Sequence, residues 1–262
     1  MSATSYEKRG KVAVITMMSP PVNGLGAALR AGLIKALDKA LGSPGVKAIV
    51  LTGSGSGFSA GADIREFNSP KAAAPPTLHT LIAAFEASPK PVVAAIHGTC
   101  MGGGLELALG CHYRVTKPDA QIALPEVKIG LIPGAGGTQR LPRALGLEAA
   151  LNMIVSGNVV PAQKLAGTPL FDEVAEGELL PTAVMFAERL IREKRPPKRV
   201  RDLKVQHANP EGFLMFARNT VKAVAGPFPA PVKCVEAVTA AASQPFAEGL
   251  ATEQRLFHEI LL

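Results

Sequence analysis

The chain has 262 residues, of which 47% are hydrophobic, and it carries a formal net charge of +7. This composition excludes a disordered chain and allows a sizeable core. No apolar run reaches the roughly 18 residues that a membrane helix needs, and the N-terminus lacks the apolar stretch of a signal peptide. Three cysteines without a CxxC pair predict neither a disulfide framework nor a zinc site. We therefore expect a soluble protein of a reducing compartment: cytoplasmic or, in a eukaryote, peroxisomal with any targeting signal outside this chain.

The positive charge is compatible with two kinds of partner, a small anionic ligand and nucleic acid. A basic protein attracts small anionic ligands through its field. Nucleic acid is poorly supported, because the chain has no Trp and only two Tyr with which to stack on bases. The densest basic cluster lies between Arg189 and Arg201 and is typical of a solvated helix end and loop. We expect an anionic small-molecule substrate, no nucleic acid and no membrane.

Predicted strands and helices alternate up to about residue 195. Apolar and β-branched runs predict strands over 11–17, 46–52 and 91–96, and a short one over 174–175. Apolar residues at helical spacing predict helices over 27–41, 77–88, 105–109, 136–143, 148–155 and 180–194. Three further helices, over 211–225, 231–243 and 246–262, follow without strands between them.

This order of elements predicts an α/β fold in which strands are covered by helices. We expect a core over residues 1–195 that contains the active site, and a helical C-terminal segment over residues 196–262. The last predicted helix ends in apolar residues, whereas chain ends are usually polar and frayed. It should therefore either dock on the core or lead into a longer chain.

Two carboxylates stand in apolar surroundings within the most apolar part of the chain. Glu106 lies among leucines directly after Gly102-Gly103-Gly104, and Glu126 lies in the segment Leu-Pro-Glu-Val. A buried carboxylate costs several kcal/mol unless it is paired, hydrogen-bonded or neutral. Either glutamate alone would be interpreted as a satisfied buried acid. Together, and next to glycine turns with exposed backbone N–H groups, they predict an acid/base site around a carbonyl.

Other motifs in the chain are rejected. Ser59 lies in a GxSxG pattern, but a glycine-serine loop separates it from the preceding strand, unlike a nucleophile elbow. The glycines at 134–137 lack the GxGxxG spacing of a dinucleotide site. The histidines and cysteines at 97, 100, 111 and 112 lack the spacing of metal ligands.

Three segments resemble the motifs of the enoyl-CoA hydratase/isomerase (crotonase) superfamily. They are SAGADI at 59–64, GGGLELAL at 102–109 and PEVKIGLIPGAGGTQRLPR at 125–143, in the family's order and with its separations. The resemblance is strong over about residues 10–190. The segments after 190 are most similar to the N-terminal hydratase part of bifunctional β-oxidation enzymes, in which a 3-hydroxyacyl-CoA dehydrogenase follows.

The resemblance implies the family's fold, a spiral of ββα units, and it implies a role for eight residues. Glu106 and Glu126 match the two catalytic glutamates. Ala62 and Gly103 would donate the two N–H groups of the oxyanion hole, and Gly134 would help to hold the catalytic water. The remaining three positions would contact coenzyme A: Ala60, Asp63 and Ile64.

The family's hydratases use both glutamates, whereas its simple isomerases need only the second. The resemblance therefore implies an enoyl-CoA hydratase of fatty acid β-oxidation, without a metal or other cofactor and without NAD for this chain alone. A Δ3,Δ2-enoyl-CoA isomerase, alone or as a second activity of the same site, is the alternative. Outside enzymes, an acyl-CoA-binding module and a nucleic-acid binder are the other hypotheses.

Some properties are left open by the sequence. Stand-alone relatives form trimers or dimers of trimers, and bifunctional relatives can be monomers, so a homotrimer, a hexamer and a monomer are all considered. Two interacting acids titrate as a pair, and the sequence does not assign the resting proton to Glu106 or to Glu126.

Overall fold

The structure is a computed structural model that describes residues 3–66 and 69–261. Its larger sheet has the strand order β1–β2–β3–β5–β7–β10. These strands are β1 (Thr4–Arg9), β2 (Val12–Met17), β3 (Ala48–Gly53), β5 (Val92–Ile96), β7 (Tyr113–Thr116) and β10 (Glu173–Val174). All neighbours are parallel except β1, which forms an antiparallel hairpin with β2.

The smaller sheet has the order β4–β6–β8–β9. Its strands are β4 (Gly57–Ser59), β6 (Thr99–Met101), β8 (Gln121–Ala123) and β9 (Val160–Pro161). The first three are parallel, and β9 runs antiparallel to β8. Each turn of the chain thus adds one strand to each sheet and then a helix, as in β3–β4–α2, β5–β6–α3 and β7–β8–α4. This is the expected spiral of ββα units.

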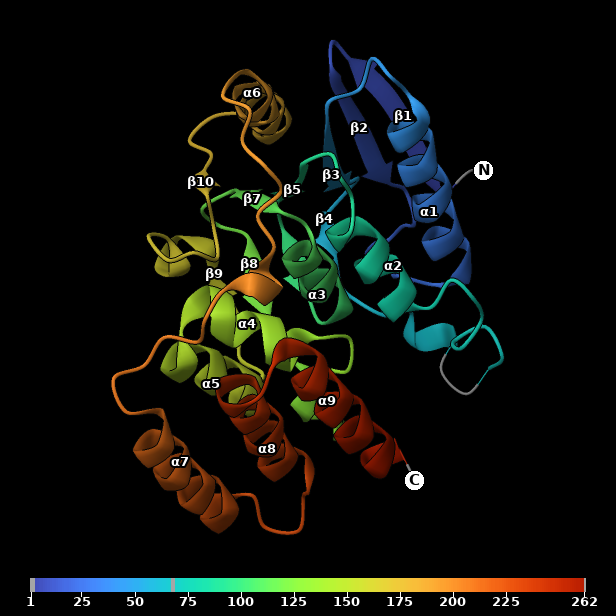
Figure 1. Cartoon of the computed structure of the whole chain (residues 1–262). Coiled ribbons are helices and arrows are strands. Elements are labelled where there is room, and N and C mark those ends of the chain that lie inside the picture. Colours follow the sequence, from blue (N-terminus) through green and yellow to red (C-terminus); the bar gives the residue numbers. More distant parts are fainter. Residues whose placement is uncertain (1–2, 67–68, 262) are drawn as a thin grey trace.

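Helices surround the sheets on several sides (Figure 1). The earlier ones are α1 (Ala27–Gly42), α2 (Leu78–Glu86), α3 (Gly103–Gly110), α4 (Gly137–Leu145), α5 (Leu147–Ser156) and α6 (Leu179–Arg192). The last three are α7 (Pro210–Val224), α8 (Ala230–Ser243) and α9 (Phe246–Leu261). Short 3-10 turns lie at Ile64–Glu66 (η1), Glu126–Ile129 (η2), Ala162–Leu165 (η3) and Val200–Asp202 (η4). The predicted helices therefore form with ends shifted by a few residues; residue 262 lies outside the described part.

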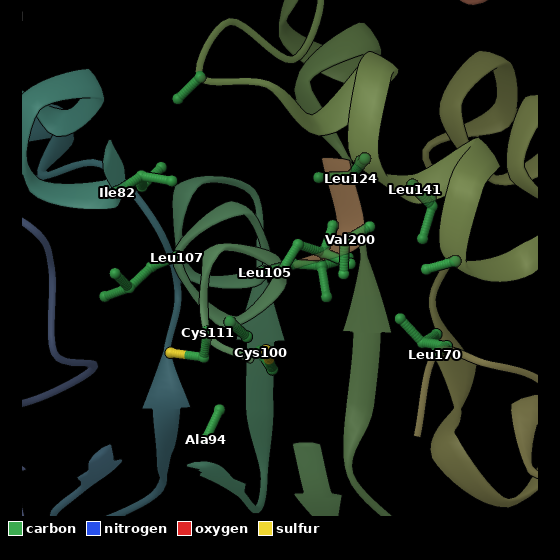
Figure 2. Close-up of a cluster of buried hydrophobic side chains, with 14 of the residues drawn as sticks. Ile82, Ala94, Cys100, Leu105, Leu107, Cys111, Leu124, Leu141, Leu170 and Val200 are labelled. Carbon is green, nitrogen blue, oxygen red and sulfur yellow. The ribbon is translucent and has the colours of Figure 1, made fainter. Parts of the chain in front are cut away.

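Side chains on the large sheet alternate between two cores. Val50 and Val93 face α6 and pack with Phe186 and Leu190. Their neighbours Leu51 and Ala94 face the opposite side and join the main core. Figure 2 shows part of this core around α3, with Ala94, Cys100 and Leu105 among the labelled side chains. Because both faces of the sheet are buried, the sequences of these strands are continuously apolar.

The C-terminal helices share the main core with the spiral. Cys234 and Val238 of α8 and Leu256 of α9 are buried in the same cluster as Leu105 and Leu141. In Figure 1, α8 lies against α4 and α5, α9 lies against α4 and α8, and α7 packs on the outer side of α8. The last helix docks on the core, and it brings side chains from the end of the described chain to the middle of the fold.

The sequence analysis missed β1 and the short strands β4, β6, β7, β8 and β9. The strand β1 is polar because it is an edge strand, with side chains alternating between partly buried and exposed. The three-residue strands of the smaller sheet are too short for a periodic pattern. The predicted strand over 174–175 lies one residue earlier, at Glu173–Val174.

Candidate active site

The candidate residues come from the carboxyl ends of three neighbouring parallel strands. The strand β4 leads into the loop with Ala62, β6 leads into Gly103 and the helix of Glu106, and β8 leads into Glu126. Carboxyl ends of adjacent parallel strands meet at one edge of a sheet. The topology therefore brings together segments that are some 20 to 60 positions apart.

Glu106 is fixed by backbone donors of the turn that leads into α4. It is 2% exposed, and its Oε1 accepts hydrogen bonds from Ala135 N and Gly137 N, both at 2.8 Å. A Cβ on Gly137 would lie 2.8 Å from that oxygen, so a side chain there would displace the carboxylate. Burial raises the pKa of Glu106, and the two N–H groups and the charge of Arg140 oppose this increase.

Glu126 has a different environment, and as a residue it is only partly buried. Its Oε2 is buried and has no hydrogen-bond partner among the described residues. Burial raises the pKa of this carboxyl well above its ordinary value, and the charge of Glu106 raises it further. A Cβ on Gly102 would lie 3.1 Å from Glu126 Oε1, which places the carboxyl at the start of α3.

Backbone N–H groups of Ala62 and Gly103 lie next to each other. A Cβ on Gly103 would be 3.3 Å from Ala62 N, and a Cβ on Gly61 would be 3.0 Å from Gly103 N. Gly61 has φ +104°, which favours glycine. Within the described residues neither N–H donates to a protein acceptor. Two adjacent free donors can receive an oxygen atom that develops negative charge.

The loop that carries Ala62 is anchored from behind by the turn before α1. Ser59 Oγ donates to Asn23 O at 2.7 Å, Ala60 N donates to Val22 O at 2.9 Å, and Leu25 N donates to Gly61 O at 2.8 Å. The hydroxyl of Ser59 is fully buried, so it acts as a structural support and not as a nucleophile.

The three predicted contacts to coenzyme A lie along this loop. Ala60 is partly buried, Ile64 is 72% exposed, and Asp63 pairs with Arg65 at 2.8 Å. The guanidinium of Arg65 lowers the pKa of Asp63. An open cavity of about 530 Å³ lies over the loop, lined by Asp63, Arg65, Glu66, Ser69, Pro70 and Lys71. The lining thus carries two cations and two carboxylates, and one cation, Arg65, is already paired with Asp63.

Gly134 lies in the same turn as the donors to Glu106, but it does not bond that carboxylate itself. A Cβ on Gly134 would lie 2.6 Å from Phe257 Cδ2, so α9 closes against this glycine. Its backbone hydrogen bond to His79 opposes the lowering of the pKa of His79 by burial. Its predicted role in holding a water is not tested by these contacts.

Two charged residues near the site were missed by the sequence analysis. Glu253 of α9 is fully buried and accepts hydrogen bonds from Gly136 N at 2.6 Å and Thr138 N at 3.0 Å. Arg140 is 3% exposed and pairs with Glu86 at 3.0 Å. The helical spacing of Glu253 with the buried residues Phe246, Gly249 and Leu256 was the available signal.

Neither a metal site nor a disulfide is present in the part of the chain that the structure describes. No group of three His, Cys, Asp or Glu is arranged for a cation there. The three cysteines are free and buried, and burial raises the pKa of each thiol. No helix within the described ranges is long and apolar enough to cross a membrane.

The spiral of ββα units, with paired glutamates beside free N–H donors, defines a crotonase-type protein. The sequence matches the enoyl-CoA hydratase/isomerase family over residues 7–211, and the chain belongs to that family.

Curated relatives include a peroxisomal bifunctional enzyme of Danio rerio, 42% identical over 94% of this chain and 34% of its own length. A probable enoyl-CoA hydratase of Bacillus subtilis is 39% identical over 80% of this chain and 83% of its own length. The crystal structure of an enoyl-CoA hydratase from Polaromonas matches with a TM-score of 0.67 and 26% identity, over 98% of this chain and 91% of that one. The chain spans about a third of the length of the peroxisomal bifunctional enzymes that it matches.

Proposed function

We propose that the chain adds water to trans-2-enoyl-CoA to give 3-hydroxyacyl-CoA, as a step of fatty acid β-oxidation. The observation that supports this most directly is the contrast between the two carboxyls. Glu106 has two backbone donors that favour its charged form, whereas Glu126 has a raised pKa and an oxygen that no described residue bonds. One base and one acid, side by side, are what the addition of water to a double bond requires.

The thioester oxygen is placed by the two free backbone donors. It would accept hydrogen bonds from Ala62 N and Gly103 N, which polarise the conjugated double bond. The same bonds stabilise the enolate-like transition state as charge moves onto that oxygen. One donor of this kind is typically worth about 10²–10³ in rate.

The two glutamates move the protons. The carboxylate of Glu106 takes one proton from a water whose oxygen forms the new bond to C3. The electron pair of the C2–C3 π bond then takes the proton of Glu126 at C2. The site is left with a proton on Glu106 and a charge on Glu126, and proton exchange restores the starting state. The unpartnered oxygen of Glu126 favours this resting assignment, because a neutral carboxyl tolerates burial far better than a charged one.

We propose that coenzyme A binds along the exposed loop after β4. Ala60, Asp63 and Ile64 would lie along the adenine and pantetheine of coenzyme A, and Gly134 would help to hold the water. The net charge of +7 favours an anionic substrate. We propose no metal, no NAD and no nucleic acid for this chain. A peroxisomal or cytoplasmic location stays a prediction, and so does the oligomeric state, for which a trimer, a hexamer and a monomer are considered.

Isomerisation of 3-enoyl-CoA is the second candidate activity. The single observation in its favour is the Oε2 atom of Glu126, which has no partner among the described residues and could move a proton between two carbons without a second acid. The Glu106→Gln variant separates the two activities. A hydratase loses its turnover in this variant, whereas an enzyme that is mainly an isomerase keeps most of its 3-enoyl-CoA turnover.

The test of function is the loss of the conjugated enoyl-thioester absorbance after addition of a short trans-2-enoyl-CoA, repeated with a long one. We expect rapid loss with 3-hydroxyacyl-CoA as the product, and the ratio of the two rates gives the chain-length preference. Binding of both substrates without turnover would reject the hydratase and favour the isomerase or the binding module.

A further inference from the structure

A four-residue turn at 135–138, which contains the first two residues of α4, is held between the carboxyl groups of two glutamates from different parts of the chain. The N–H groups of Ala135 and Gly137 donate to Glu106 Oε1, both at 2.8 Å. The N–H groups of Gly136 and Thr138 donate to Glu253, at 2.6 and 3.0 Å. Successive donors therefore point alternately to Glu106 on α3 and to Glu253 on α9.

The backbone of this turn allows the alternation. Gly136 has φ +97°, a conformation that other residues rarely adopt. It is followed by Gly137, where a side chain would collide with Glu106. The hydroxyl of Thr138 adds a third hydrogen bond to Glu253 Oε2, and Gln139 Nε2 in turn donates to that hydroxyl at 2.8 Å. Both oxygens of Glu253 are thus occupied by the turn.

The helix α9 is itself held firmly where it meets the turn. Phe257, one turn after Glu253, packs against Gly134. At the start of the helix, the ring of Phe246 lies beneath the guanidinium groups of Arg140, Arg143 and Arg201, at 4.5 to 5.2 Å. Two of these cations, Arg140 and Arg201, also contact the buried carboxylate of Glu86. The position of Glu253 is therefore well defined.

We propose that Glu253 is a positioning residue for the hydratase reaction: by binding Gly136 and Thr138, it orients Ala135 and Gly137 so that they hold the carboxylate of Glu106. The inference rests on the proposed function. Glu253 does not act on the substrate, because it is fully buried and both of its oxygens are bonded to the turn. Its effect on the reaction passes through the backbone to Glu106.

The experiment compares Glu253→Ala and Glu253→Gln with Glu248→Gln. Glu248 lies on the same helix, in its first turn, and is exposed, so it is a matched control. In Glu253→Ala we expect kcat for hydration to fall about 10- to 100-fold with KM for enoyl-CoA within about twofold, because a small displacement of a catalytic group has this effect. Glu253→Gln keeps one oxygen acceptor and should recover part of the loss, to about 3- to 10-fold below wild type. The control should match wild type.

A second readout does not depend on activity. Hydrogen exchange at the amides of Ala135 and Gly137 should accelerate in Glu253→Ala, because these amides lose their fixed acceptor geometry. The acceleration should be smaller in Glu253→Gln and absent in Glu248→Gln.

If the Ala variant does not fold, the measurements on the Gln variant test the positioning role. A folded variant with wild-type exchange at both amides and wild-type kcat overturns the positioning role. The positioning role is also overturned if kcat and substrate affinity fall by the same factor and the melting temperature falls with them. An inactive wild type would reject the proposed function, while the exchange rates would still decide the role of Glu253 in holding Glu106.

Discussion

The two glycine-rich segments of the site use the same backbone chemistry for opposite purposes. In the loop of Gly61 and the start of α3, the N–H groups of Ala62 and Gly103 have no acceptor within the described chain. In the turn 135–138, four successive N–H groups are bonded to carboxyl groups of the protein. The first segment has donors that could receive a ligand oxygen, and the second uses all of its donors to hold Glu106 and Glu253. Glycines alone therefore do not identify a ligand site, because their use depends on which acceptors the fold supplies.

The largest expected effect concerns the acid that lies beside the free donors. We expect Glu126→Gln to lower kcat for hydration about 10²–10⁴-fold, the usual contribution of a general acid or base. The amide has a similar shape to the carboxyl but no acidic proton. Steady-state kinetics with a short enoyl-CoA measures this loss. Wild-type turnover in the folded variant would show that the proton for C2 comes from elsewhere.

A second prediction tests whether activity depends on the pair of N–H donors, Ala62 and Gly103, or only on an unstrained backbone at Gly61. In Gly61→Ala the new methyl group would lie 3.0 Å from Gly103 N and disturb the pair of donors. We expect kcat/KM to fall about 10²-fold, close to the loss of one oxyanion donor. The control is Gly55→Ala, which also has a positive φ but no neighbour within 4 Å. If both variants lose activity equally, strain explains the effect and the two donors do not.

A third, smaller effect concerns the carboxylate on the other side of the turn 135–138. Burial, with the charge of Glu106 as a further cause, raises the pKa of Glu253 from 4.5 to about 8. Between these two values the folded state binds a proton that the unfolded state releases, so this group makes the protein less stable as the pH rises from about 5 to 8. The Gln variant lacks this dependence.

Thermal unfolding over that pH range measures the difference. The melting temperature of Glu253→Gln should rise relative to wild type as the pH increases. Glu248→Gln, at an exposed position of the same helix, is the control for the loss of one glutamate. A constant difference between Glu253→Gln and wild type over this pH range would contradict the raised pKa.

The sequence contained much of the fold, but less of the network around the site. Lone carboxylates in apolar runs identified Glu106 and Glu126, because burial without compensation is costly. Their environments were not accessible, since Ala135 and Gly137 reach Glu106 across about 30 residues and only the packed spiral brings them together.

Glu253 was missed for a different reason. It lies on the buried face of α9 with Phe246 and Leu256, but the helix also carries several exposed charges, so its pattern reads as an ordinary amphipathic helix. Similarly, β1 was missed because a polar edge strand lacks the apolar signal of the central ones. In both cases the residue pattern was present in the sequence, but it could be interpreted only once the segments that pack against α9 and β1 were known.

The most direct test of the account is hydration of a short trans-2-enoyl-CoA by Glu106→Gln. The amide oxygen of Gln can keep the bonds from Ala135 N and Gly137 N, so the fold and the turn should be preserved while the base is lost. The account predicts a fall in kcat of about 10²–10⁴-fold with acyl-CoA binding retained. Near-wild-type hydration in this variant would contradict the central claim that the carboxylate of Glu106, held by the turn, activates the water.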